Sequence, residues 1–118
     1  MRTALLYPRA YTRYIVELRP SQGAEREVEV GFVVDLDLQG HVVGIEILDL
    51  KRQAGERVIE RLEADLRGAP AMSFTCDRVN DAFYFALWNS SKSDSRPTDG
   101  VIVLDGDGHI LRIETELL

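Results

Sequence analysis

The sequence predicts an α+β, β-rich fold: two antiparallel four-stranded meanders in a pseudo-two-fold relation, forming a sandwich or flattened barrel and joined by one α-helix. Three observations support this prediction: an internal repeat, period-2 alternation of apolar residues in each copy, and one amphipathic segment between the copies. We expect one domain over residues 1–118, with repeats at about 3–50 and 72–118 and a linker helix at about 54–67. Because a unit of this size is marginal alone, the copies should bury their apolar faces against each other.

The internal repeat is visible when the chain is aligned with itself. A shift of 69 places residues 14–18 on 83–87 and residues 31–34 on 100–103, and a shift of 68 places residues 40–46 on 108–114. Identity is low, but the match extends through most of each half. Two copies with this period indicate a duplicated supersecondary unit, because a solenoid needs more repeats.

The first copy carries the strongest strand pattern in the chain. Between residues 27 and 38, apolar side chains alternate with charged or small ones, which is the period of a β-strand. A turn at residues 38–40 and a return strand at 41–50 complete a hairpin. Two earlier strands are expected at residues 3–7 and 11–19.

The second copy repeats this order of strands. They are expected at residues 73–76, 82–88, 100–104 and 109–117. A polar loop occupies residues 89–98. The hairpin turn at residues 105–108 contains two glycines, which accept positive φ.

A helix is predicted between the copies, over residues 54–67. Val58, Ile59, Leu62 and Leu66 form one apolar stripe at helical spacing. Charged residues occupy the other side of this segment, so the stripe should pack on the strands as a cover.

Strand alternation assigns an inward and an outward face to each copy. The predicted inward residues are Tyr14, Val16, Leu18, Phe32, Val34, Val43, Ile45 and Ile47 in the first copy, and Phe83, Phe85, Leu87, Val101, Val103, Leu111 and Ile113 in the second. The outward face of the first copy is polar. That of the second copy is apolar, and an apolar face needs a cover.

We therefore expect a subunit or partner interface on the outward face of the second copy. Its candidate residues are Tyr84, Trp88, Ile102, Leu104 and Ile110. Tyr84 and Trp88 are the expected anchors, because large aromatic side chains dominate the energetics of interfaces. The alternative is that the linker helix covers this face completely, since many apolar patches are internal.

The hairpin of the first copy carries a family resemblance. Residues 31–48 read Gly-Phe-Val-Val-Asp-Leu-Asp-Leu-Gln-Gly-His-Val-Val-Gly-Ile-Glu-Ile-Leu. This segment resembles the C-terminal signature of a family of small bacterial proteins, the domain of unknown function 2283. The N-terminal segment of that family is matched better by the second copy, at Asp77, Asp81, Ala82, Tyr84 and Leu87.

Each copy departs from the family pattern in one half. The first copy has Pro8, Thr12, Arg13, Ile15 and Leu18 in the N-terminal segment. The second copy has Arg112-Ile113-Glu114-Thr115 where the signature has Gly-Ile-Glu-Ile. A typical member is one such unit, so the chain looks like a fused pair. The resemblance implies a bacterial, β-rich protein and brings no established activity.

Composition excludes several classes of protein. The chain of 118 residues has 14 Lys and Arg against 20 Asp and Glu, a net charge of −6, which argues against nucleic-acid and anionic-membrane binding. No apolar run approaches the ~20 residues of a membrane helix, and no signal-peptide pattern follows Met1. Cys76 is the single cysteine, which excludes an internal disulfide and fits a reducing cytoplasm.

Two histidines and three carboxylates are the candidate ligands. His41 and His109 occupy corresponding positions, and a pseudo-symmetric pair with a carboxylate can hold a transition metal. The alternative is two strand-end histidines bonded to backbone carbonyl groups. Asp35, Asp37 and Glu46 approach the spacing of a calcium loop, although period-2 flanks favour a polar hairpin tip.

The chain lacks a recognisable catalytic motif. Asp77 and Asp81 can be paired carboxylates or can form Asx turns that lead into a strand. We therefore expect a non-enzymatic protein that self-associates or binds a small protein partner, with no cofactor. The alternative is small-ligand or metal binding in a groove between the copies, at His41 and His109.

Overall fold

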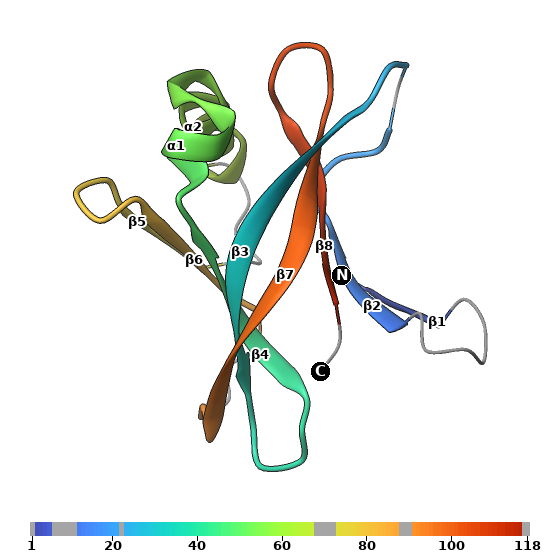
Figure 1. The fold of residues 1–118 in the computed structure, drawn as a ribbon, viewed down its shortest axis with the longest axis vertical. Coiled ribbons are helices and arrows are strands. Elements are labelled where there is room, and N and C mark those ends of the chain that lie inside the picture. The colour runs from blue at the N-terminus through green and yellow to red at the C-terminus, as the bar shows by residue number, and fades with distance from the viewer. Residues whose placement is uncertain (1, 6–11, 22, 68–72, 88–90, 117–118) are drawn as a thin grey trace.

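The protein, seen in a computed structural model, folds into one eight-stranded antiparallel sheet with two helices (Figure 1). The structure describes residues 2–5, 12–21, 23–67, 73–87 and 91–116. Its elements are β1 (Arg2–Leu5), β2 (Thr12–Glu17), β3 (Arg26–Leu36), β4 (Val42–Leu48), α1 (Leu50–Ala54), α2 (Glu56–Arg67), β5 (Ser73–Asp77), β6 (Ala82–Ala86), β7 (Asp94–Leu104) and β8 (Ile110–Glu116). The predicted β-rich α+β class is confirmed.

The strands are ordered β1-β2-β8-β7-β3-β4-β6-β5, so the predicted four-stranded meanders are wrong. Each copy contributes two hairpins, and the hairpins of the two copies alternate in the sheet. β2 pairs with β8 of the other copy, and β6 pairs with β4. The long connections before β3 and β7 allow this exchange, because only tight turns force consecutive strands to be neighbours. The predicted helix is present as α2, and the short helix α1, which was not predicted, precedes it.

The centre of the sheet is the pair β3 and β7, each of eleven residues and paired along its whole length. β7 begins at Asp94, inside the segment predicted as a polar loop. Pairing with β3 imposes the extended conformation there despite the poor strand propensity of the sequence. Pro97 is tolerated because β8 pairs only with the part of β7 from Gly100 onward, leaving that side of Pro97 open.

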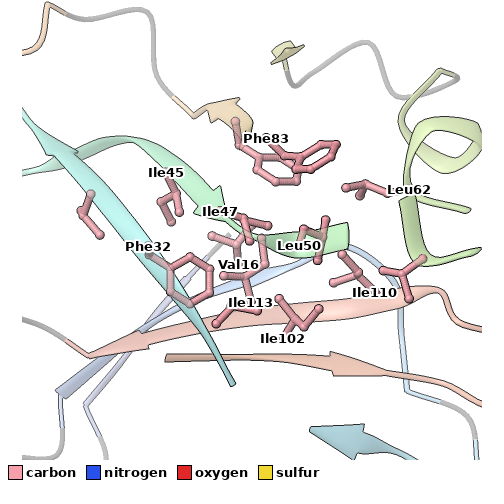
Figure 2. Close-up of a cluster of buried hydrophobic side chains, with 14 of the residues drawn as sticks. Val16, Phe32, Ile45, Ile47, Leu50, Leu62, Phe83, Ile102, Ile110 and Ile113 are labelled. Carbon is pink, nitrogen blue, oxygen red and sulfur yellow. The ribbon is translucent and has the colours of Figure 1, made fainter. Parts of the chain in front are cut away.

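A single hydrophobic cluster fills the concave side of the sheet (Figure 2). Residues of β2 and β6, from opposite flanks of the sheet, belong to the same cluster, which shows that the sheet curls around it. α2 contributes Val58, Ile59 and Leu62 as its buried residues, as the apolar stripe predicts. Phe32 lies against Gly100, where an added Cβ would be 2.8 Å from the Phe32 ring and would overlap the Glu114 carbonyl oxygen.

The predicted outward face of the second copy is corrected by the structure. Ile102, Leu104 and Ile110 are 0%, 0% and 1% exposed and belong to the core cluster. The predicted inward residues Val101, Val103 and Leu111 are outside it. The reason is register: the pairing of the two hairpins shifts opposite Val43 of β4 and opposite Leu111 of β8, which are 68 positions apart, not 69. A shift of one residue moves every side chain of a strand to the other face.

The β3–β4 and β7–β8 turns share one hydrogen-bond pattern. In the first, the Asp37 carboxylate accepts from the backbone N–H groups of Gln39 and His41. In the second, the Asp105 carboxylate accepts from those of Asp107 and His109. Gly40 and Gly108 have φ of 85° and 89°, the left-handed conformation that favours glycine. The two turns lie at opposite ends of the molecule because β3 and β7 are antiparallel (Figure 1).

The helices pack at the end of the sheet that carries the β7–β8 turn (Figure 1). Asp81, at the β5–β6 turn, accepts hydrogen bonds from two backbone N–H groups in the first turn of α1, those of Lys51 and Arg52. Arg78 of the same turn is paired with Glu56 and Glu63 of α2. Within the described residues, no helix is long and apolar enough to cross a membrane.

Candidate functional site

A polar cluster lies on the convex side of the sheet, around Asp35 of β3. Asp35 is only 6% exposed, and its two carboxylate oxygens accept one hydrogen bond each. Tyr84 Oη on β6 donates to Oδ2 at 2.7 Å, and Ser95 Oγ on β7 donates to Oδ1 at 2.6 Å. Both donors are neutral, so these bonds satisfy the carboxylate oxygens without neutralising the charge.

Gly44 makes this cluster possible. Gly44 pairs with Asp35 of β3 on one side and with Ala86 of β6 on the other. Tyr84 is two residues before Ala86 on β6 and pairs with Glu46 of β4. The Tyr84 side chain must therefore cross Gly44 diagonally to reach Asp35. A Cβ on Gly44 would overlap the Tyr84 hydroxyl oxygen and lie 2.5 Å from Cζ. Any larger residue at this position excludes the observed ring placement.

The environment of Tyr84 determines what it can do chemically. Burial, and then the hydrogen bond to Asp35 and the negative charges of Asp35 and Glu46, raise the pKa of Tyr84 to about 12. The phenol is therefore neutral at physiological pH and acts as a hydrogen-bond donor. A general acid or base needs a pKa near the working pH, so Tyr84 is suited to binding, not to proton transfer.

The cluster borders an open pocket of about 490 Å³. Its lining residues are Val33, Asp35, Glu46, Tyr84, Lys92 and Ser95. Val33 supplies an apolar surface, and the ring of Tyr84 supplies an aromatic surface. The carboxylates of Asp35 and Glu46 supply negative charge. The lining is mostly polar and charged, so the pocket is suited to a polar or charged group.

The corresponding place in the other half of the sheet is filled by an arginine. Arg112 of β8 lies between Val103 and Glu17, as Gly44 lies between Asp35 and Ala86. Its guanidinium donates to Glu114 at 2.7 Å and to Glu25 at 3.0 Å and 3.3 Å. These bonds raise the pKa of Arg112 further, and the bond from Arg112 is the main cause that lowers the pKa of Glu25.

The two histidines do not approach each other, so the predicted pair is wrong. His41 is at the β3–β4 turn with its side chain 74% exposed, close to Asp37. His109 is at the β7–β8 turn, and its Nδ1 is 2.8 Å from the Asp65 carboxylate of α2. The antiparallel course of β3 and β7 places these turns at opposite ends of the sheet. A shared metal site at the two histidines is therefore impossible.

The predicted carboxylate ligands are also divided between different roles. Asp37 is used by its own turn, whereas Asp35 and Glu46 face the pocket on the convex side. Asp77 accepts hydrogen bonds from the backbone and side chain of Asn80, so its carboxylate is engaged within the β5–β6 turn. Within the described ranges, no group of three or more His, Cys, Asp or Glu residues is placed to hold a metal ion.

The predicted interface residues lie in different parts of the structure. Ile102, Leu104 and Ile110 are core residues, Tyr84 is partly exposed at the pocket, and Trp88 lies outside the described residues. Sequence reasoning missed the contributions of Gly44, Ser95 and Arg112. The signal for two of them was present, since the self-alignment places Gly44 on Arg112. No signal marked Ser95, because its position depends on the unexpected extension of β7.

Comparison with known proteins adds no relative. No protein-family model, no curated protein and no solved structure matches the chain.

Proposed function

We propose that the protein is a non-enzymatic, self-associating module, and that a second copy adds to the sheet at β5. The observation that carries this proposal is the open edge of the sheet: β5 is the terminal strand, and only β6 pairs with it among the described strands. Natural proteins protect such edges with lysine, proline or a bulge. β5 has none of these, and Val79 in the adjacent turn is 94% exposed.

Backbone geometry identifies the groups that a second strand would meet. Leu87 donates its N–H to the Val43 carbonyl, so β6 residues at odd positions bond toward β4. Even-numbered residues of β6 consequently bond toward β5, where their partners are Ser73, Thr75 and Asp77. The backbone groups of Phe74 and Cys76 therefore point away from the sheet and are available to another strand.

A second copy of β5 fits this edge about a two-fold axis. If Phe74 pairs with Cys76 of the second copy, each residue exchanges two backbone hydrogen bonds with its partner. Thr75 then faces Thr75 of the second copy. Asp77 faces Ser73 of the second copy, so no like charges are opposed. Strand addition of this kind is a common mode of protein recognition.

We also propose that the monomer is itself a fused pair related by a pseudo-two-fold axis. Exchanging the elements of the two copies turns the strand order β1-β2-β8-β7-β3-β4-β6-β5 into its reverse, which supports this proposal. The shared hydrogen bonds of the two turns support it as well. The proposed unit is the one that resembles the domain of unknown function 2283.

Light scattering of two variant pairs tests the association. Cys76→Pro removes an outward N–H without breaking a bond to β6, and we expect a monomer; Cys76→Val keeps the N–H and should associate like the parent protein. Thr75→Arg opposes two cations across the axis and should also dissociate the assembly, whereas Thr75→Val should not. Circular dichroism of each variant measures whether it is folded. A monomeric parent protein, or association unchanged in Thr75→Arg, contradicts the proposal.

A further inference from the structure

The sheet contains the same arrangement of strand positions twice on its convex side, and only one of the two has an arginine at its centre. Strand pairing sets Glu46 between Val33 and Tyr84, and it sets Glu114 between Val101 and Ile15. Two residues before each glutamate stand Gly44 and Arg112. This correspondence follows the 68-residue spacing of the bulges and turns.

In the half of the sheet that contains β2, β8 and β7, the cation is a side chain of the protein, Arg112. The Arg112 guanidinium bridges Glu114 on its own strand and Glu25 on the connection before β3. Planar guanidinium groups bind pairs of carboxylates well because their donors are fixed in a fork. The side chain is partly buried, at 25% exposure, so the ion pairs are only partly screened by solvent.

In the other half, Glu46 corresponds to Glu114, Gly44 replaces the arginine, and a second carboxylate, Asp35, stands where the Arg112 half has Val103. Asp35 and Glu46 both line the pocket, and their strand positions place them as diagonal neighbours, with Cβ atoms about 7 Å apart. Among the described residues, neither carboxylate forms an ion pair with a basic group. The volume that Arg112 occupies in its own half is taken here by the Tyr84 ring and the open pocket.

We propose that this pocket binds a guanidinium group supplied from outside the chain. Glu46 takes the role that Glu114 has toward Arg112, and Asp35, buried and oriented by two hydroxyl groups, supplies the second negative charge. The face of the Tyr84 ring provides a surface on which a flat cation stacks. The binding site rests on the proposed duplication and does not depend on association through β5.

Among the described residues, Lys92 is the basic side chain that lines the pocket. It is exposed and lies on the segment that leads into β7, two residues before Asp94. Its positive charge at the rim opposes the entry of another cation. Removing it with Lys92→Ala should therefore strengthen guanidinium binding several-fold.

Amide chemical shifts recorded during titration with methylguanidinium chloride test the proposal, with sodium chloride at equal ionic strength as the reference. We expect saturable shifts at Asp35, Glu46, Tyr84 and Ser95, with a dissociation constant of about 1–10 mM for so small a ligand. Methylammonium should bind more weakly, because it lacks the planar fork. A blocked arginine peptide distinguishes the source of the group: tighter binding than methylguanidinium assigns the site to a protein arginine, and equal binding assigns it to a small molecule.

Matched variants decide whether the carboxylates are responsible. Glu46→Gln should weaken binding by about tenfold, while the same change in the other half, Glu114→Gln, should leave it unchanged. Conversely, Arg112→Ala should create a second saturable site near Glu25 and Glu114. Absence of saturable shifts, or equal affinity in Glu46→Gln and the parent protein, overturns the proposal whatever the state of association.

Discussion

The two halves of the sheet have the same backbone frame and different contents. Both hairpins carry a bulge before the turn, and both turns are closed by an aspartate that accepts hydrogen bonds from the backbone. Around the β7–β8 hairpin, Arg112 is tied to Glu25 and Glu114, and His109 is tied to α2. Around the β3–β4 hairpin, Gly44 leaves space for Tyr84, and His41 points into solvent.

This difference shows that strand pairing and side-chain identity determine separate properties of the sheet. Strand register fixes which positions face each other, and it is common to the two halves. The side chains placed on this frame differ: Arg112 forms ion pairs with Glu25 and Glu114, whereas Gly44 leaves Asp35 and Glu46 beside an open pocket. The four predictions below alter residues that differ between the two halves.

The largest expected effect comes from closing the space at Gly44. Gly44→Ala places a methyl group where the Tyr84 hydroxyl lies, so the ring must move and Asp35 loses a donor. We expect the free energy of unfolding in urea to fall by about 2 kcal/mol. Gly31→Ala is the control: its Cβ would meet only Leu48 Cδ1 at 4.0 Å, and the free energy should change by less than about 0.5 kcal/mol. Equal effects of the two substitutions would remove the special role of Gly44.

Removing the hydroxyl of Tyr84 should have a smaller, pH-dependent effect. Tyr84→Phe should lower the free energy of unfolding by about 1 kcal/mol at neutral pH, because Asp35 loses one hydrogen bond. The pKa of Tyr84 rises on folding from an ordinary value of 10.0 to about 12, so folding favours the neutral phenol. That contribution is complete below pH 10 and is lost as the pH rises toward 12.

The difference in stability between the parent protein and Tyr84→Phe should therefore shrink across this alkaline range. Urea titrations of both proteins at several pH values measure it, and the other tyrosines cancel in the comparison. A difference that stays constant up to pH 12 would show that the phenol of Tyr84 is not held neutral by the fold.

Substituting the internal cation should have an effect that depends on salt. Arg112→Gln removes the ion pairs to Glu25 and Glu114, and we expect a loss of up to about 1 kcal/mol at low ionic strength. The loss should decrease in concentrated sodium chloride, since screening weakens the pairs in the parent protein. Thermal unfolding at low and high salt measures this. A loss independent of salt would assign Arg112 a packing role.

The smallest effects are expected at the two histidines, and they should be unequal. His109→Gln interrupts the contact with Asp65 of α2 and should lower the free energy of unfolding by a few tenths of a kcal/mol. His41→Gln changes an exposed side chain and should be neutral within the error of urea titration. If His41→Gln is the more destabilising variant, the contact of His109 with Asp65 does not stabilise the fold more than the exposed His41 does.

Local patterns allowed much of the fold to be predicted, but not its pairing. Local patterns located all eight strands in part and the apolar stripe located α2, because both signals come from neighbours in sequence. The first part of β7, from Asp94, was predicted as a loop, and α1 was not predicted. The exchange of hairpins between the copies depends on contacts between distant segments, which alternation does not report. The shift of 69 in place of 68 then inverted the faces of β7, and core residues such as Ile102 were assigned to the surface.

The candidate site was predicted in pieces. Asp35, Glu46 and Tyr84 were each recognised as notable, but the first two were assigned to a calcium or transition-metal site and the third to an interface. They meet because β3, β4 and β6 are adjacent in the sheet. Side chains on the same face of neighbouring strands come together only when pairing is known, and pairing was the part that the sequence did not determine.

Hydrogen exchange at individual amides of β5 tests the proposed association most directly. The amide of Thr75 bonds within the sheet and should be protected at every protein concentration. The amides of Phe74 and Cys76 face outward, and the account predicts that their protection rises with protein concentration as a second copy of β5 pairs with them. Rapid exchange at Phe74 and Cys76 at every concentration would contradict association through this edge.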